Sequence, residues 1–194
     1  LCFALAEEGE RTLIIDGDRD GACAMQIGGC ANMQVYTLAD YEKGACRAKQ
    51  TLTSHPKAVN LSFISSLCLQ DLSAAERAVE ELDGLFDYIL LDKTGRGKCA
   101  SALIVTEPYA ASLKISDCCK AKLSDGGIKD IGLIVNKLNV GQILNGDVMT
   151  AQEIASLLRI PLKAVIPEDL GVPLGRWRKS TLKAFKAAAD TVSG

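Results

Sequence analysis

The sequence has little of what marks a metal-binding, secreted or membrane-spanning protein. His55 is the only histidine among 194 residues, and none of the eight cysteines has Cys-x-x-Cys spacing. Both facts argue against a zinc or metal-cluster site and favour reduced, buried thiols. No apolar run approaches the roughly 18 residues that cross a bilayer, and no signal-peptide pattern is present. We therefore expect a cytoplasmic globular protein.

An excess of charge of one sign is also missing. Lys and Arg total 22 against 24 Asp and Glu, which gives a formal net charge of −2. Nucleic-acid-binding proteins usually have a basic excess, so the composition disfavours that function. Hydrophobic residues make up 48% of the chain, enough for a sizeable core. The length predicts one domain over residues 1–194.

The first residues predict a helix that has already begun. Leu1, Ala4 and Leu5 carry small or apolar side chains, and Gly9 is placed to end the helix. The chain opens with Leu instead of Met, and no capping residue precedes the helix. We therefore expect the sequence to be incomplete at its N-terminus.

Short apolar runs alternate with helical patterns along the whole chain. This alternation predicts an α/β fold with a mostly parallel sheet and helices on both of its faces. The sequence contains no internal repeat and no linker. The expected strands cover residues 12–15, 61–64, 88–91, 103–106, 131–135 and 164–166, and the expected helices cover 73–82, 110–123, 150–158 and 180–192.

Polar residues stand where the predicted strands end. Asp16 and Asp18 follow the first strand, Asp92 follows the third, and Asn136 follows the fifth. The carboxyl ends of parallel strands share one edge of the sheet, where ligands bind in such folds. A single Asp after a strand is more often a turn or cap residue. Several together favour a polar ligand, and an apolar strand that ends in Asp suggests a magnesium-associated carboxylate of phosphoryl transfer.

With these positions located, the chain resembles the MinD/ParA group of deviant Walker ATPases, in particular its MinD branch, and the resemblance implies a P-loop NTPase-like fold. The matching segments keep the order of the family across nearly the whole chain. They are LAEEG at 5–9, TLIIDGD at 12–18, VYTLAD at 35–40, FDYILLD at 86–92, IVNK at 134–137, NGDVM at 145–149 and IPLKAVIPED at 160–169.

The resemblance implies catalytic and metal roles for three aspartates. Asp16 resembles the first switch aspartate, which holds a water on magnesium. Asp18 resembles the second, which orients the water that attacks the γ-phosphate of ATP. Asp92 resembles the Walker B aspartate, whose negative charge acts on magnesium through the groups that bind the ion directly. Without the resemblance, Asp-Gly-Asp at 16–18 would be interpreted as a turn after a strand.

The resemblance also implies a base-binding loop. Asn136 is similar to the residue whose amide reads the adenine edge, with Lys137 beside it. Pro167, Glu168 and Asp169 match the loop that lies against the base, where backbone groups matter more than side chains. From the residues alone, Asn136 could equally be a strand-end cap.

The chain departs from the family pattern in its loops. The phosphate loop GKGGVGK[ST] is absent, since its place falls just upstream of Leu1, and the chain as it stands is not expected to hydrolyse ATP. Only nine residues, 93–101, lead from Asp92 to the next strand, fewer than a crossover with a helix usually needs. Either this connection is unusual or residues are missing from it, and we favour missing residues. The segment at residues 169–173 is similarly short compared with the family pattern.

The function implied by the resemblance is an ATP- and magnesium-dependent switch that places the bacterial division site. It would form an ATP-dependent homodimer, respond to an activator of the MinE/MinC type, and contact the membrane peripherally. The alternatives are a ParA-like partitioning ATPase and a non-catalytic scaffold. The last helix, with Leu182 and Phe185 on one stripe, is expected to pack on the domain. The basic segment 176–179 is interpreted as a solvated turn with a packed Trp177.

Overall fold

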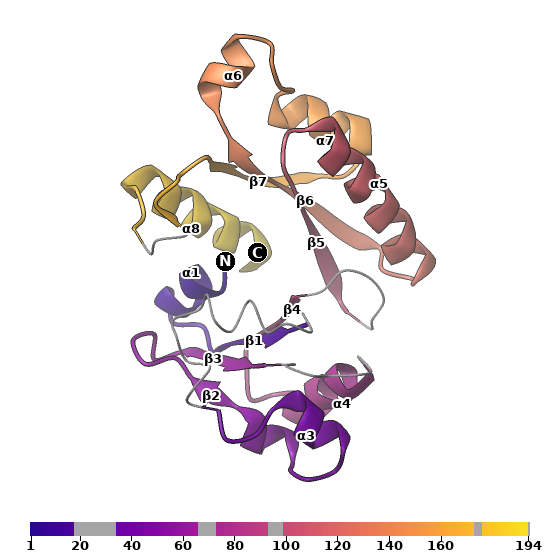
Figure 1. Ribbon diagram of the computed structural model, residues 1–194, viewed down its shortest axis with the longest axis vertical. Helices are drawn as coiled ribbons and strands as arrows, with labels where there is room; N and C mark the ends of the chain where they lie inside the picture. Colours follow the sequence, from indigo (N-terminus) through magenta and orange to yellow (C-terminus); the bar gives the residue numbers. More distant parts are fainter. Residues whose placement is uncertain (18–33, 66–72, 93–98, 173–175, 194) are drawn as a thin grey trace. The chain divides into compact units, whose positions relative to one another are not determined.

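All six strands that the sequence predicts are present in the computed structural model (Figure 1). The structure describes residues 1–17, 34–65, 73–92, 99–172 and 176–193. These residues divide into two compact units, Cys2–Thr94 and Gly95–Gly194, and Leu1 belongs with the second. A single nucleotide-binding domain over 1–194 stays a prediction.

The first unit contains a four-stranded sheet in the order β2-β3-β1-β4. The strands are β1 (Thr12–Asp16), β2 (Thr53–Ser54), β3 (Leu61–Ile64) and β4 (Tyr88–Asp92). Strand β1 is buried along its whole length, because it pairs in parallel with β3 on one side and β4 on the other. Only the short β2 runs antiparallel, against β3.

Helices cover both faces of this first sheet. Leu13 and Ile15 of β1 pack on one face against α4 (Ser73–Leu82) and α3 (Leu38–Glu42), with η2 (Ala48–Thr51) beside them. Ile14 points to the other face and packs with Ala6 of α1 (Cys2–Glu7) and Phe63 of β3. The alternation along β1 explains why its sequence is continuously apolar: side chains on both faces are buried.

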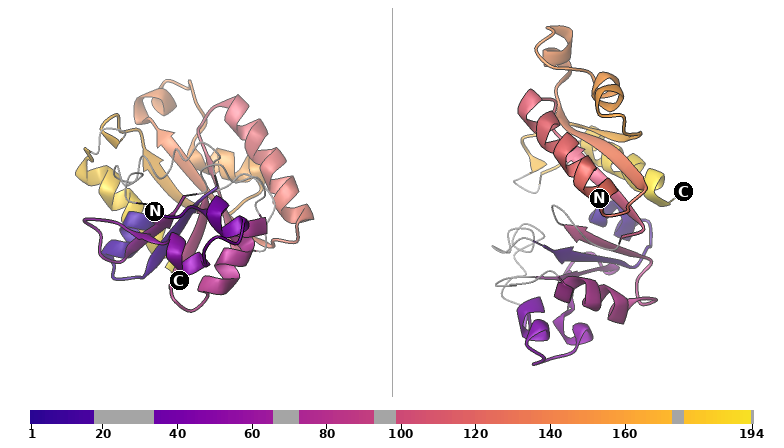
Figure 2. Two further views of the ribbon diagram at one scale, coloured as in Figure 1. Left: turned by 60° about the horizontal axis from the view of Figure 1, so that its bottom comes forward. Right: turned by 90° about the vertical axis from the view of Figure 1, so that its right-hand side faces the viewer.

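The second unit contains a parallel sheet in the order β5-β6-β7. Its elements are β5 (Ser101–Thr106), α5 (Ala110–Asp125), β6 (Asp130–Leu138), α6 (Val140–Leu144), α7 (Ala151–Leu158), β7 (Leu162–Pro167) and α8 (Lys179–Ser193). Leu133 and Val135 of β6 pack on one face with α5 and α7. Ile134 packs on the other face with Ala188 of α8. Figures 1 and 2 show α8 on the opposite side of these strands from α5 and α7.

Several helix boundaries follow the local signals in the sequence. Helix α4 occupies the expected residues. Thr150 caps α7 by accepting a hydrogen bond from the backbone of Glu153, whose carboxylate in turn accepts one from the backbone of Thr150. Gly9 follows α1 with a φ of 100°, a conformation that favours glycine. The short elements α3, η2, β2 and α6 were not expected from the sequence.

The expected fold class is confirmed: the sheets are mostly parallel and have helices on both faces. Helix α8 packs on its own unit as expected, although Leu182 remains 38% exposed. Trp177 lies edge-on against Phe185, with 5.4 Å between the ring centroids, and is half exposed. Within the described residues, no helix is both long and apolar enough to cross a membrane.

Candidate functional site

Asp16 and Asp92 lie side by side at the carboxyl edge of the first sheet. They are partners in the register of the parallel strands β1 and β4. The pairing continues one residue further, where the Gly17 N–H donates to the Asp92 carbonyl oxygen at 2.8 Å. Asp16 is 2% exposed, whereas Asp92 is exposed. The structure therefore brings two of the three predicted aspartates together, and Asp18 lies outside the described residues.

Two adjacent carboxylates can contribute to a magnesium site. Magnesium prefers hard oxygen ligands and is usually held by one or two carboxylates together with waters and substrate phosphates. The described residues contain no group of three or more His, Cys, Asp or Glu side chains that could hold a metal ion unaided. Asp16 and Asp92 therefore fit a magnesium ion that comes with a phosphate ligand, and a metal cage made of protein alone is not found in this part of the chain.

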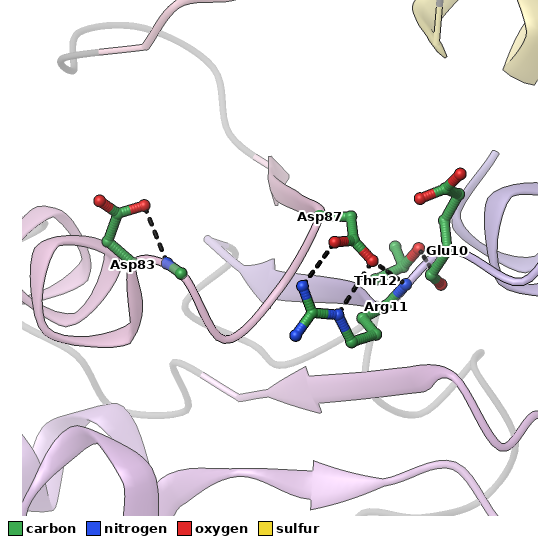
Figure 3. A network of polar contacts seen from close by, with 6 residues as sticks. Glu10, Arg11, Thr12, Asp83 and Asp87 are labelled. Atoms are coloured by element: carbon green, nitrogen blue, oxygen red, sulfur yellow. Dashed lines mark hydrogen bonds and ion pairs between the residues drawn. The ribbon is translucent and has the colours of Figure 1, made fainter.

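At the opposite end of the same strands, Arg11 and Asp87 form an ion pair (Figure 3). The Arg11 guanidinium donates to Asp87 through Nε at 3.0 Å and Nη2 at 2.6 Å, and the Arg11 backbone N–H donates to the same carboxylate at 2.8 Å. These bonds lower the pKa of Asp87 to about 2. Among the described residues, the Asp92 carboxylate has no hydrogen bond or ion pair.

Asn136 lies at the carboxyl edge of the second sheet, at an irregularity of β6. Val135 pairs with Val165 of β7, and the next pair is Leu138 with Pro167. Strand β6 therefore has one more residue than β7 between these pairs, which is a β-bulge. The bulge contains Asn136 and Lys137, and Lys137 has a φ of 56°. The Asn136 side chain is partly exposed and has no hydrogen bond within the described residues.

Two side-chain contacts flank the bulge. Lys137 Nζ donates to the Glu107 carboxylate at 2.5 Å, and this contact raises the pKa of Lys137. On the other side, Asn139 Nδ2 donates to Glu168 Oε2 at 2.8 Å. The Glu168 N–H also donates to the Leu138 carbonyl oxygen at 3.0 Å. Asn136, Lys137, Pro167 and Glu168 are thus brought together at one edge of the second unit, and their part in base binding stays a prediction.

The Asp169 carboxylate is occupied by donors of its own chain. It accepts hydrogen bonds from the backbone of Gly171 at 3.0 Å, the backbone of Arg178 at 2.9 Å and the Thr181 hydroxyl at 2.8 Å. These bonds lower its pKa, and its side chain is only 2% exposed. The carboxylate therefore ties the loop after β7 to the start of α8. That Asp169 takes part in base binding stays a prediction, and its backbone, not its carboxylate, would make the contact.

Sequence reasoning did not find Glu107 or Asn139. Glu107 directly follows the strand expected at 103–106, so the rule that located Asp92 and Asn136 applies to it as well. Asn139 caps α6 by accepting from the backbone N–H groups of Gly141 and Gln142. A five-residue helix shows no periodicity in a sequence, so Asn139 carried no signal.

Two relatives match most of the chain, although no family model matches it. The chain is 32% identical over 183 residues to a septum site-determining protein MinD of Guillardia theta, a match that covers 87% of this chain and 68% of that protein. It is 28% identical over 223 residues to the septum site-determining protein MinD of Helicobacter pylori, covering all of this chain and 83% of the relative. Because the second match is longer than the 194 residues of this chain, that relative has internal segments that this chain lacks.

Three solved structures share the fold, each over 98% of this chain. The MinC:MinD cell division protein complex of Aquifex aeolicus has a TM-score of 0.86 at 23% identity, with 86% of that chain covered. MinD of Pyrococcus horikoshii, complexed with Mg-ADP, has a TM-score of 0.80 at 22% identity, also with 86% covered. A plasmid partition protein of Borrelia burgdorferi bound to AMPPNP has 0.74 at 13% identity, with 91% covered. The structural likeness establishes a P-loop NTPase-like fold, and together with the sequence identity to MinD it shows that the chain belongs to the MinD/ParA family.

Proposed function

We propose that this chain is the nucleotide-binding body of an ATP-dependent switch that acts in placing the division site. The observation that carries the proposal is the pairing of Asp16 with Asp92 at the carboxyl edge of the first sheet. Membership of the MinD/ParA family supports nucleotide binding. In the second unit, Asn136 has a partly exposed amide at the carboxyl edge of that unit's own sheet. The complex of Pyrococcus horikoshii MinD with Mg-ADP supports magnesium as the metal.

In the proposed mechanism the aspartates act through water and charge. Bound magnesium supplies positive charge that neutralises the phosphates during transfer. Asp92, an exposed carboxylate at the sheet edge, would attract the ion, and the buried Asp16 would position a water for it. Asp18 orients the water that attacks the γ-phosphate. This chemistry depends on positioning and charge neutralisation rather than on covalent catalysis.

The second unit is proposed to bind the base. The Asn136 amide can donate and accept at once, which suits the adjacent donor and acceptor on the edge of adenine. Lys137 stands beside it, and the backbone at Pro167, Glu168 and Asp169 lies against the base. This assignment leaves the Asp169 carboxylate in its structural role.

Hydrolysis also needs a phosphate loop, and the 194 residues contain no GKGGVGK[ST] motif. Within each unit, one edge strand is as apolar as a central strand. Residues 88–91 of β4 are all apolar or aromatic yet half-buried, and Val105 of β5 is 58% exposed. Such edges can accept a further strand. Reading the coding DNA before the Leu1 codon tests this part: an in-frame phosphate loop supports the ATPase, and a stop codon followed by a start favours a non-catalytic scaffold.

The proposed partners follow from the family. The MinC:MinD complex of Aquifex aeolicus supports a MinC-type partner, and we extend this to an ATP-dependent homodimer, a MinE-type activator and peripheral contact with the cytoplasmic face of the membrane. The second candidate is a ParA-type partitioning ATPase, favoured by the fold shared with the Borrelia burgdorferi plasmid partition protein. The net charge of −2 does not favour DNA binding, and a DNA-binding titration separates the two.

The direct test is magnesium-dependent ATP hydrolysis by the protein expressed from its complete gene. Asp92→Asn should lower hydrolysis about 100-fold, because the neutral amide no longer attracts the ion. Asp83→Asn is the matched control: this carboxylate lies in the same unit, in the turn after α4, and among the described residues it accepts a hydrogen bond only from the Gly84 N–H (Figure 3). No hydrolysis by the wild type, or equal rates for the two variants, contradicts the proposal.

A further inference from the structure

The backbone at Lys137 is held in a conformation that lysine rarely adopts. Its φ of 56° lies in the left-handed region, where the Cβ of any residue other than glycine crowds the backbone. Of the described non-glycine residues, only Arg159 shares this feature, and Arg159 ends α7, where left-handed residues are common. Lys137 is instead inside a strand, within the bulge of β6. Its surroundings must therefore stabilise the conformation.

Glu107, which directly follows β5, is placed to provide this stabilisation. Thr106 and Val135 are partners in the parallel register, so Glu107 stands one residue beyond the ladder, next to Asn136 and Lys137. Its carboxylate accepts a hydrogen bond from the Lys137 ammonium, with 2.5 Å between Nζ and Oε1, and both side chains are partly exposed. A charged hydrogen bond of this kind favours the left-handed backbone conformation of Lys137, because that conformation brings its ammonium to the end of β5.

Asn139 fixes the other side of the bulge. Its amide nitrogen donates to Glu168, and its amide oxygen accepts from the first backbone N–H groups of α6. One side chain thus connects the end of β6, the start of α6 and the loop after β7. Together with the bond from the Glu168 N–H to the Leu138 carbonyl oxygen, it closes the bulge on the β7 side.

Asn136 lies between these two attachments, and its side chain has no hydrogen bond within the described residues. A polar amide whose backbone is fixed on both sides, and whose own groups stay uncommitted, is arranged for a ligand. Bulges often re-aim a side chain next to an active site. Building the attachments from other strands allows the amide to keep both its donor and its acceptor available.

We propose that Glu107 and Asn139 are positioning residues that hold the Asn136 amide for recognition of an adenine base. This inference rests on the proposed function, because it names the residues that set base specificity at the same site. Neither residue contacts the nucleotide in this proposal. Glu107 holds the left-handed backbone at Lys137, and Asn139 holds Glu168 against the end of β6.

The first experiment measures kcat/KM for ATP and for GTP in the protein expressed from its complete gene. Glu107→Gln should lower the preference for ATP over GTP about two- to fivefold, because the ion pair it breaks is partly exposed and screened by solvent. The kcat for ATP should change less than twofold, since the phosphates are untouched. Asp117→Asn, which removes an exposed carboxylate of α5 in the same unit, should leave the preference as it is.

A double-mutant cycle separates positioning from general damage. Glycine adopts a positive φ without strain, so in the Lys137→Gly background the Glu107→Gln change should have no further effect on the ATP preference. An unchanged preference in Glu107→Gln overturns the inference. So does an effect of equal size in the Lys137→Gly background, because Glu107 would then act independently of the backbone it is said to hold.

Amide hydrogen exchange without nucleotide tests the same claim independently of ATP binding. The Glu168 N–H, which donates to Leu138, should exchange about tenfold faster in Glu107→Gln and in Asn139→Asp. Asn139→Asp keeps the acceptor that caps α6 and removes the donor to Glu168. If the wild type binds no nucleotide, the proposed function fails, and the exchange rates still decide whether these residues hold the loop. Unchanged exchange in both variants overturns the inference.

Discussion

The paired strands β1 and β4 have aspartate side chains at both ends, and these carboxylates differ in their hydrogen-bond partners. At the amino end, the Asp87 carboxylate is neutralised by three hydrogen bonds from Arg11 (Figure 3). At the carboxyl end, Asp16 and Asp92 lie side by side, and Asp92 has no partner among the described residues. Two carboxylates on neighbouring strands repel one another, and a bound cation would relieve this repulsion. The amino end serves the fold, and we propose that the carboxyl end serves a ligand.

The carboxyl edge of the second unit refines this contrast. Glu107 and Glu168 are bonded within the chain and leave Asn136 uncommitted between them, whereas Asp169 is fully occupied at the start of α8. Position at the carboxyl edge therefore does not by itself identify a ligand-binding side chain. The hydrogen-bond partners of each residue decide, and this distinction can be tested.

The largest expected effect comes from breaking the core that holds the strand ends in place. Leu133 is fully buried in β6, so Leu133→Ala should lower the free energy of unfolding by about 2–5 kcal/mol. Val105→Ala on the exposed side of β5 should change it by less than about 0.5 kcal/mol. Urea unfolding measures both. A small cost for Leu133→Ala would mean that the packing of the second unit is described wrongly.

Asp169→Asn should have the next largest effect on stability. The amide loses the charged acceptor that holds Arg178, Gly171 and Thr181 around the start of α8, so the unfolding midpoint should fall and α8 should exchange its amide hydrogens faster. The drop should be smaller than for Leu133→Ala. ATP affinity should change little once the variant is folded. A large loss of ATP affinity at unchanged stability would place the Asp169 carboxylate in the ligand site after all.

Asp87→Asn should destabilise the protein less, because the ion pair it breaks is partly exposed and screened by solvent. Hydrolysis of ATP should stay within about twofold of the wild type, since this carboxylate lies at the end of the strands away from Asp92. Loss of hydrolysis in a variant with wild-type stability would remove the difference between the two strand ends.

The smallest effect is the pH dependence of the same pair. The pKa of Asp87 is lowered from 3.8 to about 2, so its contribution is present above 3.8 and is lost as the pH falls through about 2. The difference in urea midpoint between wild type and Asp87→Asn should therefore be constant near neutral pH and shrink between pH 3.8 and 2. A difference that already disappears near pH 5 would contradict the Arg11 contact.

Much of the fold was predictable because continuous apolar runs and helical patterns are local signals. The strand that ends at Asp92 and the helix expected at 150–158 are where the sequence indicates. The bulge at Asn136 and Lys137 was not predictable, since an extra residue in β6 appears only against the register of β7. The role of the Asp169 carboxylate depends on Arg178 and Thr181, nine and twelve residues later, and no local pattern shows those contacts.

The most direct test of the central claim is an equilibrium titration of the protein, expressed from its complete gene, with ATP in the presence and absence of magnesium. If Asp16 and Asp92 form the cation side of a nucleotide site, magnesium should tighten ATP binding about 10- to 100-fold in the wild type and much less in Asp92→Asn. An ATP affinity that is the same with and without magnesium, or no binding at all, would contradict the account.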